Sequence, residues 1–391
     1  MATISTDLKQ DTLHIKLTGI IDSSNAAEVE REIAEKRSSV ACSNIVLDFA
    51  DLGYISSAGL RIVLRLRKEF PELSIVNVSS DVYEILEMTG FTEMVDVRKA
   101  YRVLSVDGCE AIGRGANGKV YRIDSDTIVK VYNNPEALPE IQRERELART
   151  AFVLGIPTAI PYDVVRVGEG YGSVFELLDA KSFAQLLSSG EKSVEEIAQM
   201  MAELLRQIHG TVVREGSMPS MRDTALGWAS FLDGHLPEDT YAKLYALVEA
   251  IPEDMHMMHG DLHIKNVMYQ NGEALLIDMD TLCHGNPVFE LGSVYNAYQG
   301  FSLTDHNIVK KFLGVDYETC TELWQRTLSL YLGTDDPERF AEVERKAEVI
   351  GFMRLLRRTI RRNHDGDMNE RIAAYRSKLI ELVDEVDTLL F

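Results

Sequence analysis

The sequence predicts a two-domain protein in which a small α/β domain, a sheet with helices, is followed by a two-lobed α+β domain. Strand and helix patterns alternate through residues 1–105, which is typical of a small α/β layer. From about Tyr101 the pattern changes to short strands around a glycine-rich turn, and helical periodicity dominates from about Asp179. The net charge also divides unevenly, with −4 in residues 1–105 and −17 in residues 106–391. We therefore expect the domain boundary near residue 105.

The first domain is expected to alternate three strands with three helices. Alternating apolar residues indicate a half-buried strand, and apolar residues at helical spacing indicate helices that pack on the sheet. The expected order is strand 13–17, helix 26–36, strand 44–50, a turn and helix in 54–70, strand 73–79 and helix 82–88. The second domain is expected to contain a small lobe of about 106–178, an antiparallel sheet with one helix. A helical lobe of about 179–391 follows.

The composition excludes several classes of protein. A net charge of −21 argues against a nucleic-acid partner, because such proteins need a cationic surface. The first residues lack a secretory signal, and no run of eighteen apolar residues predicts a membrane span. The cysteines are scattered without paired spacing, as in a reduced, cytoplasmic protein; they are Cys42, Cys109, Cys283 and Cys320.

A glycine-rich stretch, IGRGANGKV at residues 112–120, has the spacing G-x-G-x-x-G-x-V through Gly113, Gly115 and Gly118. A strand follows the last glycine, whereas a dinucleotide-binding turn would need a helix there. Glycines at a hairpin tip allow backbone N–H groups to approach a triphosphate. A purely structural hairpin would show the same pattern, so the stretch gains weight only together with other motifs.

A lysine and a glutamate are expected to form a phosphate clamp beside this hairpin. Lys130 interrupts the apolar strand TIVKVY, and a helical glutamate could hold its ammonium group against the phosphates. Glu144 is preferred to Glu146 because apolar residues follow Glu144 at +3, +4 and +7. These positions place Glu144 on the buried face of the helix.

The segment VFELLDA, residues 174–180, is expected to connect the two lobes. In a two-lobed nucleotide-binding protein this connector passes the adenine, and backbone groups of Glu176 and Leu178 would bind the base. An ordinary edge strand would have the same local pattern, and both interpretations stay open.

The segment HGDLHIKN, residues 259–266, is expected to form a catalytic loop. Asp261 precedes Asn266 by five positions, and Asp278 ends an apolar strand twelve positions later. Phosphoryl transfer needs an acceptor for the hydroxyl proton and oxygen ligands for Mg²⁺. Asp261 can accept the proton, and Asn266 and Asp278 can bind the metal.

A zinc site is the alternative interpretation of this segment. His256, His259 and His263 could converge on the ion, but zinc would leave the glycines, Lys130 and Glu144 unexplained. The ordered motifs therefore favour phosphoryl transfer, with His259 as a structural residue of the loop.

On these motifs, residues of about 106–391 resemble the protein-kinase-like fold, in its aminoglycoside phosphotransferase and choline kinase branch. LLIDMDTLCHGNPVFELG and LLRQIHG also resemble segments of that branch. Departures are Ile208 in place of leucine and Glu290 in place of aspartate. The resemblance implies ATP- and Mg-dependent transfer of a γ-phosphate to a hydroxyl of a small molecule.

Residues 1–105 resemble a STAS domain, as in anti-sigma-factor antagonists, through VLDFADLGYISSAGLRIVL. The resemblance places a phosphorylatable serine at Ser57 and implies a signalling protein as partner. Ser56 stands where sporulation-type members have aspartate, and both serines could merely cap a helix. An alternative function is therefore a serine protein kinase that acts on its own or a partner's STAS domain. Another is a non-catalytic nucleotide-sensing signalling protein.

An arginine row in MRLLRRTIRR is the last feature; it comprises Arg354, Arg357, Arg358, Arg361 and Arg362. These residues fall on one helical stripe. We expect a solvated face paired with nearby carboxylates. In so acidic a chain the row could instead receive an anionic substrate or the STAS domain.

Overall fold

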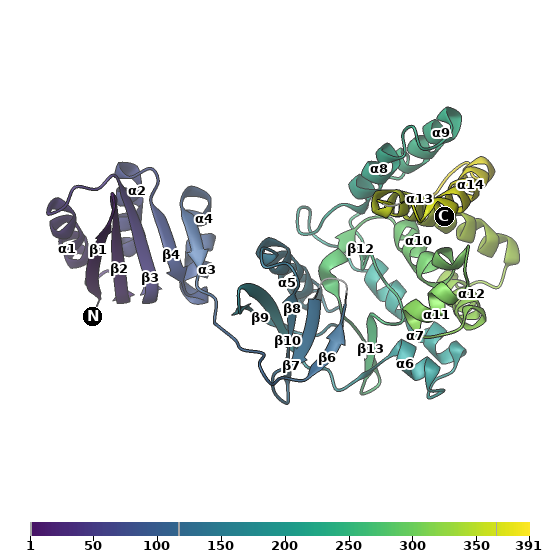
Figure 1. Cartoon of the computed structure of the whole chain (residues 1–391), viewed down its shortest axis with the longest axis horizontal. Helices are drawn as coiled ribbons and strands as arrows, with labels where there is room; N and C mark the ends of the chain where they lie inside the picture. The colour runs from purple at the N-terminus through teal and green to yellow at the C-terminus, as the bar shows by residue number, and fades with distance from the viewer. Residues whose placement is uncertain (1, 116–117, 365) are drawn as a thin grey trace. The chain divides into compact units, whose positions relative to one another are not determined.

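The fold is described for residues 2–115, 118–364 and 366–391 of a computed structural model. Contacts divide the chain into two compact units. The first comprises Met1–Ser105 with Val165–Gly168, and the second comprises Val106–Val164 with Glu169–Phe391. The predicted fold class, an α/β unit followed by a larger α+β unit, is confirmed (Figure 1).

The first unit contains a five-stranded sheet in the order β1-β2-β3-β4-β5. Its strands are β1 (Thr3–Lys9), β2 (Thr12–Ile21), β3 (Asn44–Ile55), β4 (Ser74–Val78) and β5 (Asp96–Lys99). Its helices are α1 (Ala26–Ser38), α2 (Ser57–Glu69), α3 (Ser80–Met88) and α4 (Phe91–Met94). β1 is antiparallel to β2, and the other neighbouring strands are parallel. The sequence pattern did not predict β1, α4 or β5.

The small lobe of the second unit is a five-stranded sheet in the order β6-β7-β8-β10-β9, with one helix. The strands are β6 (Ala111–Arg114), β7 (Gly118–Arg122), β8 (Thr127–Tyr132), β9 (Pro161–Val167) and β10 (Gly170–Glu176). The helix, α5 (Leu138–Val153), directs an apolar face inward that includes Leu147, Ala148 and Ala151. β6, β7, β8 and β10 are antiparallel neighbours in this order, as predicted for this lobe.

The large lobe contains most of the helices of the second unit (Figure 1). They are α6 (Phe183–Ser188), α7 (Val194–His209), α8 (Met221–Phe231), α9 (Glu238–Glu249), α10 (Pro287–Tyr298), α11 (Asn307–Leu313), α12 (Tyr317–Leu332), α13 (Pro337–Arg362) and α14 (Asn369–Glu385). Short strands lie between them: β11 (Lys181–Ser182), β12 (Met257–Met258), β13 (Val267–Gln270), β14 (Glu273–Leu276) and β15 (Cys283–His284). Single 3₁₀ turns are η1 (Met279–Thr281) and η2 (Gly300–Ser302).

Helix α10 is the central element of the large lobe. Every residue from Val288 to Tyr298 is buried, because its sequence is apolar on almost all sides. Its two polar exceptions near the loop 259–266, Glu290 and Ser293, therefore need hydrogen-bond partners inside the protein. Among the described residues, no helix has both the length and the apolar composition to cross a membrane.

Candidate active site

Lys130 and Glu144 form a buried ion pair in the small lobe. Lys130 Nζ donates to Glu144 Oε1 at 2.9 Å, and the Glu144 side chain is only 3% exposed. The alternative glutamate, Glu146, is exposed and contacts Arg145 instead. Burial alone would lower the pKa of Lys130, but the carboxylates of Glu144 and Asp278 raise it above its usual value. Lys130 therefore presents a fixed positive charge.

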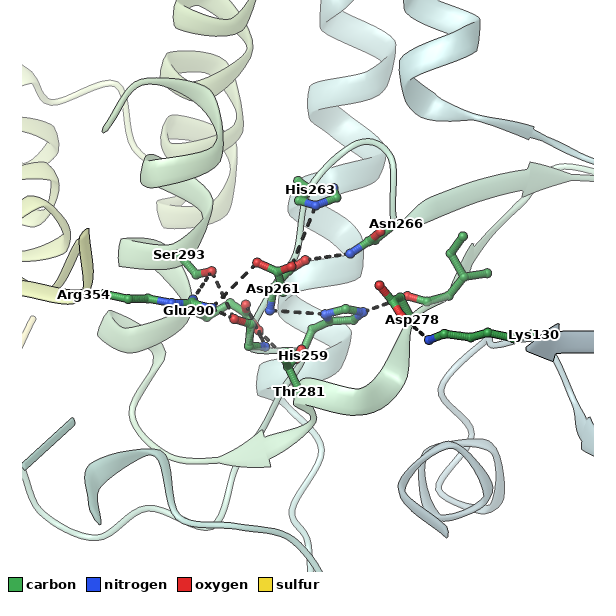
Figure 2. A network of polar contacts seen from close by, with 12 residues as sticks. Lys130, His259, Asp261, His263, Asn266, Asp278, Thr281, Glu290, Ser293 and Arg354 are labelled. Atoms are coloured by element: carbon green, nitrogen blue, oxygen red, sulfur yellow. Dashed lines mark hydrogen bonds and ion pairs between the residues drawn. The ribbon is translucent and has the colours of Figure 1, made fainter. Parts of the chain in front are cut away.

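Asp278 comes from the large lobe to the same ammonium group (Figure 2). Its Oδ1 accepts a hydrogen bond from Lys130 Nζ at 2.7 Å, and its side chain is 45% exposed. The residue follows β14 in the left-handed conformation, with φ of 64°. Burial would raise the pKa of Asp278, yet Lys130 lowers it below its usual value. An ionised carboxylate thus reaches the solvent beside Lys130.

The glycine-rich hairpin joins β6 to β7 next to these residues. The Gly115 N–H donates to the Gly118 carbonyl at 2.9 Å, and the intervening residues 116 and 117 lie outside the described part of the chain. A Cβ at Gly118 would lie 2.2 Å from the Val131 carbonyl oxygen, whereas a Cβ at Gly115 would meet no atom within 4 Å. A Cβ at Gly113 would make only ordinary contact with Val120, at 3.4 Å. Gly118 is therefore required by strand packing.

Asp261 and Asn266 lie in the loop between β12 and β13. Asn266 Nδ2 donates to the Asp261 carbonyl at 3.0 Å, which leaves Asn266 Oδ1 as an acceptor without a described donor. The Asp261 side chain is 47% exposed. The backbone N–H of Ile277 donates to the Asn266 carbonyl at 3.0 Å. This bond fixes the loop to the segment that carries Asp278.

His259 is a structural residue of this loop, fully buried (Figure 2). Its Nε2 lies 3.1 Å from the Ile277 carbonyl, and its Nδ1 lies 3.4 Å from the Asp261 backbone nitrogen. Since a carbonyl only accepts and an amide N–H only donates, His259 carries its proton on Nε2. It therefore connects the backbone of Asp261 to the strand end before Asp278.

The histidines of the alternative zinc site do not converge. His256 Nδ1 contacts Asp254, and the His263 ring packs edge-on against Phe312. Within the described ranges, no group of three or more His, Cys, Asp or Glu residues could hold a metal ion. The geometry thus gives the zinc interpretation no support.

Glu290 binds the backbone of this loop, a role that could not be assigned from its position in the sequence. Its carboxylate accepts hydrogen bonds from the N–H of His259 at 2.5 Å and from that of Gly260 at 3.1 and 3.2 Å. Burial raises the pKa of Glu290 above its usual value, while these donors oppose the shift. Gly260 has a φ of +80°, and a Cβ there would lie 2.4 Å from the Thr281 carbonyl oxygen. The loop therefore requires glycine at this position.

Arg354 is a site residue that was not assigned from the sequence. Its Nη1 donates to the Gly260 carbonyl at 2.9 Å and to Ser293 Oγ at 2.7 Å. Its Nη2 lies 3.8 Å from Asp261 Oδ1. The expected carboxylate partner is present for Arg354, but its side chain is only 25% exposed, so the expectation of a solvated position is wrong for this residue. The dense arginine row was the only sequence signal for it.

Glu176 and Leu178 lie at the end of β10 and just beyond it, in the connector between the lobes. The Glu176 N–H donates to the Ile160 carbonyl at 3.0 Å, so its carbonyl is the backbone group that could bind a base. The Leu177 N–H donates to the Asp126 carbonyl at 2.8 Å, and no described hydrogen bond uses the Leu178 N–H. An adenine could thus bind between one acceptor and one donor.

A cavity of about 540 Å³ lies behind this connector and is lined by residues that include Phe152, Glu176 and Gln207. None of Lys130, Asp261 and Asp278 lines it. Lys130 and Asp278 instead come together beside the loop 259–266 that carries Asp261, so we place the candidate active site there (Figure 2).

Ser57 belongs to the first unit and is the first residue of α2. Its side chain is exposed. The cap of the helix is Ser56, whose Oγ accepts from the Gly59 N–H at 3.5 Å. The hydroxyl of Ser57 is thus presented to solvent at a helix N-terminus, where an added anion is favoured.

Comparisons with known proteins agree with this two-unit arrangement. Residues 108–323 match the family described as "Phosphotransferase enzyme family", and residues 3–104 match the STAS domain family. A putative anti-sigma factor antagonist, BtrV of Bordetella bronchiseptica, is 38% identical over 85 residues, which are 21% of this chain and 72% of that protein. Residues 3–104 therefore form a STAS domain.

Solved structures with the fold of the second unit include a thermostable mutant of aminoglycoside phosphotransferase APH(4)-Ia. Its ternary complex with ADP and hygromycin B is 14% identical with a TM-score of 0.50, covering 71% of this chain and 94% of that one. Its apo form is 12% identical with the same TM-score and the same coverage. This similarity shows a shared kinase-like fold.

Proposed function

Because this chain belongs to the phosphotransferase enzyme family, we propose that it transfers the γ-phosphate of ATP to a hydroxyl group of a small molecule. The observation that carries the proposal is the position of Lys130, whose ammonium group joins Glu144 of the small lobe to Asp278 of the large lobe. In the proposed reaction the STAS domain regulates the enzyme or binds a protein partner.

On the nucleotide side, Lys130 binds phosphate oxygens, and Glu144 keeps its ammonium group in position. The hairpin of Gly113, Gly115 and Gly118 covers the phosphates. The Glu176 carbonyl and the Leu178 N–H bind the adenine.

The oxygen groups at the loop fit Mg²⁺, which prefers carboxylate and carbonyl ligands. Asn266 Oδ1 lacks a described donor, and the Asp278 carboxylate is ionised and partly exposed. These two residues would hold the ion. When bound, Mg²⁺ would neutralise part of the phosphate charge.

Asp261 acts as the base for the acceptor hydroxyl. The acceptor oxygen forms a bond to the γ-phosphorus as the bond from that phosphorus to ADP breaks, and the hydroxyl proton passes to the Asp261 carboxylate. The hydrogen bonds of Glu290, Arg354 and His259 to this loop fix the backbone on which the carboxylate stands.

The proposal is tested by ADP formation from Mg·ATP, with hydroxyl compounds as acceptors, in wild type and Asp261→Asn. We expect the variant to lose about 10²-fold or more in rate while it keeps its affinity for AMP-PNP. Asp233→Asn, an exposed residue after α8, is the matched control. Equal rates in wild type and Asp261→Asn would refute the assigned base. Nucleotide binding without ADP formation by wild type would indicate a nucleotide-sensing module instead.

A second candidate function is protein phosphorylation of a STAS domain, favoured by the exposed Ser57 hydroxyl. Mass spectrometry after incubation with Mg·ATP would detect a phosphate at Ser57 of this chain or of an added STAS domain. The phosphate should disappear in Ser57→Ala and remain in Ser56→Ala. An unmodified Ser57 under conditions that support ADP formation would exclude it as the chain's own acceptor.

A further inference from the structure

The arginine row on α13 places a local positive charge beside Asp261 in an otherwise acidic chain. Arg354 and Arg358 are one helical turn apart and therefore share a face. Arg354 lies 3.8 Å from the Asp261 carboxylate. Among the described residues, none of Arg357, Arg358, Arg361 or Arg362 forms an ion pair with a carboxylate. The charge of the row is thus left largely unneutralised.

Three of these guanidinium groups lie over aromatic rings, and Arg357 is one of them, at 5.8 Å from the centre of the Phe231 ring. Arg354 lies over the Trp228 ring at 5.4 Å, and Arg358 lies over the Phe301 ring at 5.5 Å.

A guanidinium group that contacts a ring can still donate through N–H groups that do not face the ring. In Arg354 the Nη1 group already donates to Gly260 and Ser293, so Nη2, near Asp261, is the nitrogen that an anion could reach. Guanidinium N–H groups bind carboxylate and phosphate in bidentate geometry. Arg358 also reaches solvent, so its N–H groups are accessible.

Arg354 and the phosphate clamp lie on different sides of Asp261. In Figure 2, Asp261 lies between Arg354 on one side and Asp278 with Lys130 on the other. If the nucleotide phosphates bind at Lys130, the acceptor hydroxyl must reach Asp261 from the side of Arg354. The acceptor would therefore enter next to the arginine row.

Electrostatics agree with this placement. Partial burial together with the neighbouring Arg362 and Arg354 lowers the pKa of Arg358, and Asp261 partly offsets the effect. Burial with Arg361 and Arg354 likewise lowers the pKa of Arg357. Like charges that repel one another are stabilised by an added anion, whereas a cationic amine would increase the repulsion.

We propose that the acceptor bound beside Asp261 carries an anionic oxygen group, a phosphate or a carboxylate, that Arg354 and Arg358 bind. This proposal rests on the proposed phosphotransferase function, because it assigns the acceptor of that reaction. Arg354 also holds the loop through the Gly260 carbonyl, so Arg358 is the more selective position for a test.

The test is calorimetric binding to the full chain in the presence of AMP-PNP and Mg²⁺. The probes share a skeleton and differ in charge: glycerol, glycerol 3-phosphate and glycerate, and glucose, glucose 6-phosphate and glucosamine. We expect an anionic probe to bind about tenfold or more tightly than its neutral counterpart, with affinity that falls as salt rises. The phosphate and carboxylate probes distinguish the two anionic groups.

Arg358→Gln should raise the Kd of the anionic probe about tenfold or more, while the control Arg326→Gln should leave it nearly unchanged, because Arg326 lies on α12, is exposed and pairs with Glu195 and Glu322. The proposal is overturned if neutral or cationic probes bind as tightly as the anions, or if no anionic probe binds at millimolar concentration. Equal effects of the two variants would also overturn it.

Measurement of ADP formation separates this proposal from the proposed function. An anion that binds at Arg358 but is not phosphorylated would count against phosphoryl transfer alone. Phosphorylation of a neutral or cationic compound in preference to its anionic counterpart would support the enzyme and overturn the anionic acceptor.

Discussion

The carboxylate of Glu290 accepts the backbone N–H of Gly260 at 3.1 and 3.2 Å, so a buried residue of the central helix holds the loop that carries Asp261. An aspartate would have a side chain shorter by one methylene at the same helix position. The longer glutamate here reaches the N–H of His259 as well.

Removal of this carboxylate should destabilise the second unit. Glu290→Ala leaves the buried N–H groups of His259 and Gly260 without a partner, and we expect the free energy of unfolding to fall by about 3 kcal/mol. Urea unfolding followed by tryptophan fluorescence would measure it. Glu290→Gln keeps one acceptor oxygen and should lose clearly less; an equal loss in both variants would contradict the hydrogen-bond explanation.

Loss of the buried ion pair between Lys130 and Glu144 should lower the catalytic efficiency with ATP. Glu144→Gln frees Lys130 from one of its two carboxylates, and we expect kcat/KM for ATP to fall about 10- to 100-fold. Steady-state kinetics with varied ATP would measure the change. Glu146→Gln, on the same helix but exposed, is the control and should behave as wild type. Equal falls in the two variants would mean that the helix as a whole, and not the pair, was disturbed.

Alanine substitutions at Gly118 and Gly115 should have different effects, the first on the stability of the protein and the second on nucleotide binding. A methyl group at Gly118 would lie 2.2 Å from the Val131 carbonyl oxygen, so Gly118→Ala should lower the free energy of unfolding by about 1–3 kcal/mol. Gly115→Ala meets no atom within 4 Å and should leave stability within about 0.5 kcal/mol. If Gly115 lies over the phosphates, its variant should raise KM for ATP. Thermal unfolding with ATP kinetics would show both effects, and an unstable Gly115→Ala would contradict the packing argument.

Much of the arrangement could be predicted because it is local in sequence or fixed by spacing. The alternating strands of the first unit and the motif residues around Lys130, Asp261 and Asp278 belong to this class. Strand β1 could not be predicted, since all of its residues except Ile4 are exposed and it lacks an alternating apolar pattern. Strand β5 has only four residues, too few for a periodic signal.

The roles of Glu290 and Arg354 could not be predicted for a different reason. Each binds a backbone group of Gly260, and a backbone group is present at every position of the chain. Arg354 also lies far from Asp261 in the sequence. Only the folded packing of α10 and α13 against the loop reveals such partners.

His209, the last residue of α7, should make the stability of the second unit depend on pH. Its ring is buried, its Nδ1 lies 2.8 Å from the Tyr331 hydroxyl, and its Nε2 is buried without a partner in the described structure. Burial lowers the pKa of His209 from 6.5 to about 3. The folded protein therefore contains His209 in its neutral form, and protonation of the buried ring would destabilise the fold. The contribution of His209 to the free energy of unfolding is fully present above about pH 6.5, its pKa in the unfolded chain. It is lost as the pH falls towards 3, its pKa in the folded protein.

At pH values below the unfolded pKa of His209, the free energy of unfolding should fall by close to about 1.4 kcal/mol per pH unit. Between pH 7.5 and 5.0 the total loss should be about 2 kcal/mol. Burial also lowers the pKa of His263, to about 4, so wild type contains both contributions. The difference between the pH profiles of wild type and His209→Asn isolates the contribution of His209. Both tryptophans, Trp228 and Trp324, lie in the second unit, and urea unfolding followed by their fluorescence reports on that unit alone. The variant should lose less stability on acidification, whereas the exposed control His364→Asn should match wild type; parallel pH profiles for all three proteins would show that His209 is not buried in its neutral form.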